Sequence, residues 1–124
     1  MKTRRARREH AKLRFQIRPR LYHGEDIAIG PGKAELLEQI AGTGSLRKAA
    51  VAMEMSYMRA WTLVRTMNRC FKRPLVAAKR GGPEGGEAVV TETGKAVLAA
   101  YRRMEAQSLR STRRALSELS KHLR

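Results

Sequence analysis

One short stretch of the sequence groups side chains that can recognise another molecule by hydrogen bonds, charge and apolar contact: Ser56, Tyr57, Met58, Arg59 and Thr62. Ser56 is a favoured helix N-cap, and Thr62 follows Met58 by four residues, so the group would stand on the first turns of one helix. The major groove of DNA is about 12 Å wide and accepts one helix, whose side chains then reach the base edges. This spacing predicts a helix whose first turns contact bases.

Basic residues lie on both sides of this stretch. Across the whole chain, 27 Lys and Arg residues stand against 11 Asp and Glu residues, and the formal net charge is +16. A field of this sign attracts acidic polymers, and contacts from Lys and Arg to phosphates supply much of the affinity for DNA. The predicted phosphate contacts are Arg47, Lys48, Arg65, Lys79 and Arg80.

Three small residues complete the predicted DNA-binding set. Ser45 precedes a short apolar run and would cap a helix just before the one that starts at Ser56. Gly81 and Gly82 open the segment "GGPEGG", whose glycines allow the tip of a hairpin to come close to DNA. We therefore expect Ser45, Gly81 and Gly82 to lie at the contact surface.

Signals for catalysis or a bound metal are weak. Ser45 and Lys48 form an S-x-x-K pair, but the serine is needed as a cap and the companion motifs of such enzymes are missing. The segment "GGPEGG" lacks the G-K-[ST] of a nucleotide-binding loop. The histidines are far apart and have no partner at ligand spacing; they are His10, His23 and His122. We predict that the chain is not an enzyme and has no catalytic residue, metal site or cofactor.

The cysteine content and the hydropathy of the chain indicate its compartment. Cys70 is the one cysteine in the sequence, which excludes an intramolecular disulfide and suits a reducing environment. No apolar run approaches the ~20 residues that a membrane span requires. We expect a cytoplasmic protein with no membrane partner.

Capping residues and apolar spacing divide the first half of the chain into elements. Residues 15–29 alternate apolar and polar side chains around "HGED", which predicts two short strands. A helix over 33–41 would stop at Gly42, and a helix of about two turns would follow Ser45. The helix capped by Ser56 would run to about residue 71 and be ended by a proline at position 74.

The second half predicts a hairpin and a long helix. "LVAAKR" and "EAVVTE" suit two strands joined by "GGPEGG". Thr93 would cap a last helix, which has no Gly or Pro from Lys95 to Arg124. Three helices, a tight turn between the second and third, and a glycine-tipped hairpin form the order of a winged helix-turn-helix.

Apolar residues of the last helix fall into two sets, with a shift of register after Met104. The second set, which begins at Leu109, follows the spacing of a helix-pairing seam, with Thr112 filling one place in it. Such a helix needs a partner to cover it. The predicted dimerisation residues are Val97, Tyr101, Met104, Leu109, Leu116 and Leu119.

A set of motifs also resembles a known family. "GKAELLEQIAGTGSLRKAAVAMEMSYMRAWTLVRTMNRCFKRPLV", the double glycines of the hairpin and "VVTETGKAVL" are similar to the N-terminal DNA-binding domain of ModE-type molybdate-responsive transcriptional regulators, whose fold is related to LysR-type winged helices. The resemblance covers about residues 30–105. It implies a homodimer with its recognition helices in successive major grooves. The family often has a basic residue where this chain has Met58, so the base preference is expected to differ.

The molybdate-binding domains of that family follow its DNA-binding part. This sequence ends where they would begin, so we expect the chain to lack them, and a separate molybdate-binding protein becomes a candidate partner. The predicted fold is mainly α with a small β component, a winged helix-turn-helix with a long C-terminal dimerisation helix. Its expected parts are a basic flexible arm (1–14), the DNA-binding domain (15–92) and the dimerisation helix (93–124).

Two functions remain open at this point. The first is a homodimeric regulator of transcription that binds double-stranded DNA at specific sequences. The second is an architectural protein that binds nucleic acid without sequence choice, which the positive charge alone would support. The affinity for random DNA relative to a selected site separates them.

Overall fold

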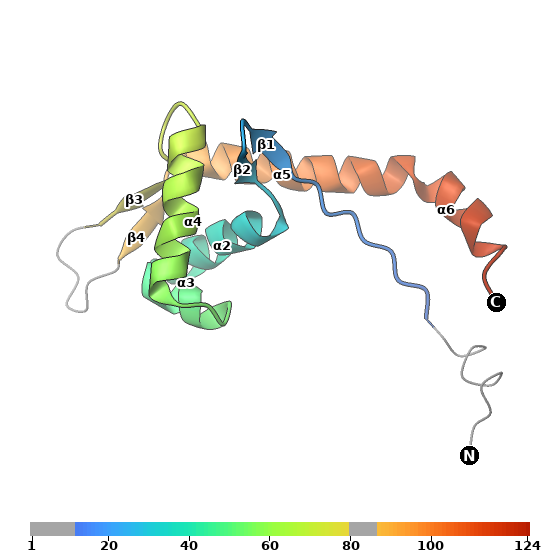
Figure 1. Cartoon of the computed structure of the whole chain (residues 1–124), viewed down its shortest axis with the longest axis horizontal. Coiled ribbons are helices and arrows are strands. Elements are labelled where there is room, and N and C mark those ends of the chain that lie inside the picture. The colour runs from blue at the N-terminus through green and yellow to red at the C-terminus, as the bar shows by residue number, and fades with distance from the viewer. Residues whose placement is uncertain (1–11, 80–86) are drawn as a thin grey trace, which may run out of the picture.

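Three helices surround the apolar core of the protein. The computed structural model describes residues 12–79 and 87–124, and in it α2 (Pro31–Thr43), α3 (Leu46–Ala52) and α4 (Tyr57–Cys70) pack against one another (Figure 1). Ala49 and Ala60 are buried where α3 meets α4, because small side chains let two helices approach closely. Large side chains fill the rest of the core and are fully buried: Leu36, Leu37, Ile40, Leu46, Val64, Met67 and Leu75.

The first helix ends two residues later than predicted. Gly42 was expected to stop it, but Gly42 lies inside the last turn and α2 continues to Thr43. Gly44 is the residue in the left-handed region, with φ 68°, and its N–H donates to the Ile40 carbonyl at 2.8 Å. Glycine is favoured at a helix end, and both Gly42 and Gly44 could serve there. The hydrogen bond of the Gly44 N–H makes Gly44 the residue that ends the helix.

Serine caps start the next two helices, as predicted. Ser45 Oγ accepts a hydrogen bond from the Lys48 N–H at 3.1 Å, and Ser56 Oγ accepts one from the Arg59 N–H at 3.0 Å. Between the two helices, Glu54 has a φ of 55° and turns the chain sharply. The caps and this turn fix the residue at which α4 begins.

The end of α4 differs slightly from the prediction. The helix ends at Cys70, and Phe71 already has extended backbone angles, so Pro74 does not stop the helix but lies in the loop beyond it. The Pro74 carbonyl accepts a hydrogen bond from the Thr91 hydroxyl at 2.7 Å. This bond fastens the loop to the start of the last helix.

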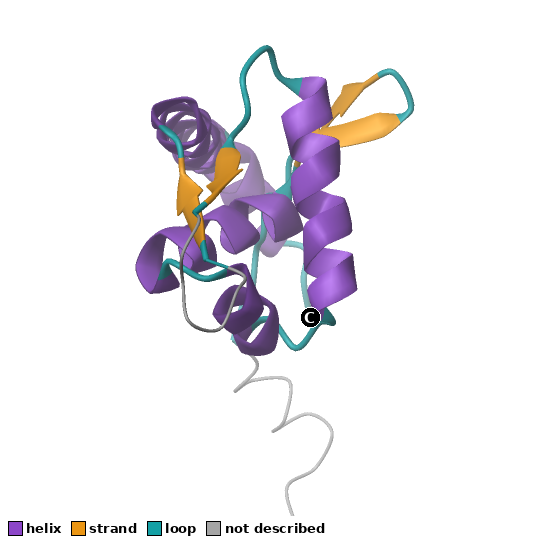
Figure 2. Ribbon diagram, turned by 90° about the vertical axis from the view of Figure 1, so that its left-hand side faces the viewer, coloured by secondary structure: helices purple, strands orange, loops and turns teal. Residues whose placement is uncertain are grey.

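Two antiparallel strand pairs lie on different sides of the helices (Figure 2). The first pair is β1 (Leu21–His23) with β2 (Asp26–Ile29), and the second is β3 (Val76–Ala78) with β4 (Ala88–Val90). The first strand was expected to start near residue 15, but β1 has three residues. Most of the predicted basic arm and the predicted hairpin tip lie outside the described residues.

The last helix starts two residues earlier than predicted. Thr91, not Thr93, is its N-cap, and the Thr91 hydroxyl oxygen accepts a hydrogen bond from the Gly94 N–H at 3.0 Å. A side chain at Gly94 would collide with the Leu75 carbonyl, so the glycine allows α5 (Glu92–Ser111) to pack closely on the loop before β3.

The predicted uninterrupted helix to the C-terminus is broken. α5 ends at Ser111, and α6 (Arg113–Ser120) follows after Thr112, whose φ and ψ are −94° and −4°. The Thr112 hydroxyl donates to the Ser108 carbonyl at 2.7 Å, a local bond that competes with regular helix geometry. α5 and α6 extend away from the three-helix body, and the β3–β4 pair lies at the opposite end of the molecule (Figure 1).

Candidate nucleic-acid interface

One side of the first turns of α4 faces away from the core. Ala60, Val64 and Met67 occupy the inner side of the helix and are buried. On the outer side the Met58 side chain is 68% exposed, and Thr62 is exposed one turn later. The Met58 side chain is therefore open to solvent, while the Thr62 hydroxyl donates a hydrogen bond to the Met58 carbonyl at 3.0 Å and keeps its oxygen free to accept one.

Tyr57 is held by two neighbours. The guanidinium carbon of Arg47, on α3, lies 4.5 Å from the centre of the Tyr57 ring, a cation–π contact. The Tyr57 ring also meets Trp61 edge to face, with ring centres 6.3 Å apart and planes at 85°. Tyr57 is half-buried as a result. It connects Arg47 on α3, a predicted phosphate contact, to the predicted recognition helix. Sequence spacing gave no signal for the contact of Arg47 with Tyr57, because these two residues belong to different helices.

The start of α3 is joined to the β3–β4 pair. Ser45 forms an isolated antiparallel bridge with Glu87, and the Ala88 N–H donates to the Gly44 carbonyl at 3.1 Å. Ser45 is half-buried and acts as a cap, while Lys48 is exposed beside it. These contacts bring one basic end of α3 next to the root of the hairpin.

The structure leaves the hairpin part of the predicted set incomplete. Lys79 is exposed at the end of β3, and its N–H donates to the Glu87 carbonyl at 2.9 Å. Arg80, Gly81 and Gly82 lie outside the described residues. Arg65 is exposed on α4 and follows Met58 by two turns along the same helix.

Asn68 fixes the hairpin to α4, a role that the sequence analysis missed. Its side-chain oxygen accepts hydrogen bonds from the backbone N–H groups of Leu75, at 2.8 Å, and Val76, at 3.3 Å. Its side-chain nitrogen donates to the Val76 carbonyl at 3.0 Å. One amide thus sets the position of β3 relative to α4.

The predicted dimerisation residues divide into buried and exposed groups. Tyr101 is 2% exposed, its hydroxyl donates to the Pro19 carbonyl at 2.9 Å, and burial raises its pKa, so its ring belongs mainly to the core of its own chain. Val97 and Leu116 are half-buried. The exposed members are Met104, Leu109 and Leu119.

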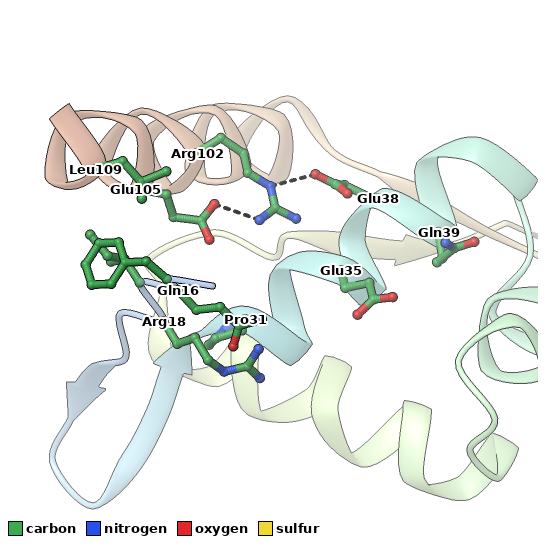
Figure 3. Close-up of a pocket in the computed structure, with 11 residues that line it drawn as sticks. Gln16, Arg18, Pro31, Glu35, Glu38, Gln39, Arg102, Glu105 and Leu109 are labelled. Carbon is green, nitrogen blue, oxygen red and sulfur yellow. Dashed lines mark hydrogen bonds and ion pairs between the residues drawn. The ribbon is translucent and has the colours of Figure 1, made fainter. Parts of the chain in front are cut away.

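A cleft lined by charged side chains lies between α5, α2 and the chain before β1 (Figure 3). Arg102 donates from Nε to Glu38 and from Nη1 to Glu105, both at 2.7 Å. The hydrogen bond to Glu38 is the main cause that raises the pKa of Arg102. Because the arginine already has two carboxylate partners, we assign it a structural role in holding α5 on α2.

The described part of the chain offers no metal centre. Across residues 12–79 and 87–124, no three His, Cys, Asp or Glu side chains gather closely enough to hold an ion. Within the same ranges, no helix combines the length and apolarity that crossing a bilayer would require.

Comparisons with known proteins agree with this geometry. No protein-family model matches the chain. The molybdenum transport protein ModE of Azotobacter vinelandii is 34% identical over 110 residues, which cover 89% of this chain and 39% of that protein. The molybdenum-pterin-binding protein MopA of Rhodobacter capsulatus is 43% identical over 77 residues, which cover 62% of this chain and 29% of MopA. The DNA-binding transcriptional dual regulator ModE of Escherichia coli K12 is 35% identical over 77 residues, with the same coverage of each chain.

A solved structure shows the same fold. The full-length LysR-type regulator LysG of Corynebacterium glutamicum superposes with a TM-score of 0.53 at 22% identity, over 73% of this chain and 30% of LysG. The chain is a ModE-like winged-helix protein. It spans between 29% and 39% of the length of the ModE and MopA relatives given above. The resemblance predicted from the sequence motifs, and the winged-helix fold, are confirmed.

Proposed function

We propose that this ModE-like chain binds double-stranded DNA at specific sequences and regulates transcription. The observation that carries the proposal is the outward-facing first turn of α4, capped by Ser56 and presenting Met58 and Thr62 beside a strongly basic surface. An apolar side chain can contact a thymine methyl, and the oxygen of a threonine hydroxyl can accept a hydrogen bond from a base edge. Transcriptional regulation by ModE relatives supports the same function.

Phosphate contacts would surround this reading surface. Arg47 and Lys48 lie on α3, Arg65 lies farther along α4, and Lys79 lies on the hairpin, so cations flank the first turn of α4 from several elements. Such contacts hold the protein in register without reading sequence. Binding should therefore weaken steeply with salt, with a log-log slope of about −0.9 for each contacted phosphate.

A second copy of the chain is the proposed partner of the C-terminal helices. Met104, Leu109 and Leu119 expose apolar area on α5 and α6, and apolar area of this kind is commonly covered in an assembly. A two-fold dimer would place two copies of α4 about 34 Å apart, the spacing of one helical turn of DNA. The molybdenum-related names of the relatives suggest a separate molybdate-binding protein as a further partner. We place the regulator in the cytoplasm and propose no enzymatic activity for it.

Selection of bound sequences from a pool of random duplexes tests the proposal. We expect an enriched motif with two related halves separated by about one helical turn, and a preference of at least about 10³-fold over random DNA. Binding without any enriched motif would contradict a sequence-specific regulator.

The formal net charge of +16 favours one alternative function, an architectural protein that binds nucleic acid without sequence choice. Competition distinguishes it from the regulator. Random duplex would displace a labelled selected duplex at equal concentration if the chain were architectural, whereas a regulator would need a large excess of random duplex.

A further inference from the structure

A basic pocket lies beside the first turn of α4 and takes in residues that the sequence analysis did not select. Its volume is about 240 Å³, and its cations come from three parts of the chain: Arg20 before β1, Lys33 in the first turn of α2, and Arg59 in the first turn of α4. We call this cavity, with the three cations that line it, the basic pocket. Arg59 was predicted to contact bases, whereas Arg20 and Lys33 belonged to no predicted site.

The positive charges of the basic pocket are not neutralised by carboxylates of the described residues. Within residues 12–79 and 87–124, none of the three cations forms an ion pair. Asp26 acts on Lys33 electrostatically, but the Asp26 carboxylate is engaged with Arg69 at 3.1 Å. Like charges held together without a counter-charge attract an anion.

Burial makes this arrangement costly for Lys33. Desolvation has the largest effect and lowers the pKa of Lys33. The charges of Cys70 and Asp26 raise it, and the nearby charge of Arg59, the smallest effect, lowers it. An anion placed among the three cations would act in the opposite direction and raise the pKa of the lysine.

The walls of the basic pocket suit a small tetrahedral anion. Gly30 and Gly32 flank Pro31 at the start of α2, and Gly30 lies so close to Arg20 that an added Cβ would come within 3.3 Å of the Arg20 side chain. The first turn of α2 contains no acidic residue and Gly30 provides no side-chain cap, so the backbone here has the same sign as the side chains. Met55 and Leu63 close the pocket from the α3–α4 side.

We propose that the basic pocket binds one tetrahedral oxyanion of the phosphate class. Arg59 stands next to Met58, the exposed residue of the proposed reading surface, so the oxyanion fits a phosphate of the DNA backbone that passes the first turn of α4. In this form the inference rests on the proposed function, and it moves Arg59 from the bases to the backbone. Free inorganic phosphate has the same chemistry and is the second source to be tested.

Lys33→Gln tests the pocket, and Lys121→Gln, which removes the same charge from an exposed position near the C-terminus, is the matched control. With duplex DNA, Lys33→Gln should weaken binding about tenfold on selected and random sequences alike. It should also reduce the magnitude of the log-log salt slope by about 0.9, the value for one lost phosphate contact. Lys121→Gln should leave the slope unchanged.

Titration of inorganic phosphate, followed by the amide resonances of Gly32 and Lys33, separates the two sources. Saturable shifts that Lys33→Gln abolishes, with duplex binding unaltered, would support a free oxyanion as the ligand. The pocket would be overturned if Lys33→Gln left the salt slope unchanged and if phosphate either caused no shifts in the wild type or caused the same shifts in Lys33→Gln. Arg20→Gln, measured in the same way, guards against a folding defect at one position. If the duplex selection yields no motif while phosphate still saturates the pocket, the proposed function fails and the oxyanion site stands.

Discussion

Helix α4 and the C-terminal helices α5 and α6 are all amphipathic, but they differ in how far the chain itself covers their apolar faces. α4 buries Ala60, Val64 and Met67 within its own chain. α6 has no buried residue, and Leu119 on it is 66% exposed. The comparison shows that the chain covers the apolar face of α4 by itself but leaves apolar side chains of its last helices exposed.

The largest expected effect is a loss of folding stability when a buried residue of α4 is truncated, with a much smaller loss for an exposed residue of α6. Met67→Ala should lower the free energy of unfolding by about 2–5 kcal/mol, because it empties a fully buried site between α4 and the core. Urea unfolding at low protein concentration measures this change. Leu119→Ala, a truncation on the exposed helix, is the control and should change monomer stability by no more than about 0.5 kcal/mol. Equal losses in the two variants would abolish the distinction between the regions.

Leu119→Ala should instead weaken association. If a second copy buries the side chain, its truncation should cost about 1.5–3 kcal/mol of dimerisation free energy. Sedimentation equilibrium of both proteins over a range of concentrations measures the difference. Dimers of unchanged affinity would show that another surface joins the copies, or that this face of α6 has a different partner.

Asn68→Ala tests how the hairpin is held to α4. The substitution leaves the Leu75 and Val76 backbone groups without their side-chain partner, which should cost about 1–3 kcal/mol of stability. Because β3 is positioned by these bonds, affinity for a selected duplex should fall as well. Fluorescence-monitored unfolding and duplex titration give the two values, and full DNA affinity in the destabilised variant would dissociate the hairpin from binding.

Much of the α4 region follows from local sequence signals. Ser45 and Ser56 cap α3 and α4 because the hydroxyl oxygen of a serine just before a helix can accept a hydrogen bond from a free N–H of the first turn. The apolar spacing of α4 likewise gives its inner face. Both are short-range rules, and the structure confirms them.

Contacts between distant segments could not be read in this way. Thr91 rather than Thr93 caps α5 because its hydroxyl also reaches the loop at Pro74, which no local pattern contains. The contact of Arg47 with Tyr57 and the meeting of Arg20 with Arg59 depend on how elements pack. The seam predicted through Thr112 assumed one unbroken helix, and the spacing gave no sign that the helix would be interrupted at the threonine.

The smallest expected effect concerns the stack between α3 and α4. Tyr57→Leu removes the ring beneath Arg47 while keeping an apolar side chain, and it should weaken duplex binding by about 0.5–1 kcal/mol. Tyr57→Phe, which keeps the ring, should bind like the wild type. In a double-mutant cycle with Arg47→Ala, the two losses should not add, because the ring acts through the arginine. Additive losses, or a loss in Tyr57→Phe, would instead favour a direct contact of Tyr57 with DNA.

The most direct measurement of the central claim is a comparison of the sequences selected from random duplex by the wild type and by Met58→Ala. Met58 is exposed, so its truncation should leave the fold intact. If the first turn of α4 reads base pairs, the variant should select a motif that is relaxed at one position in each half-site and unchanged elsewhere. An identical motif from both proteins would place sequence reading outside this turn and contradict the account.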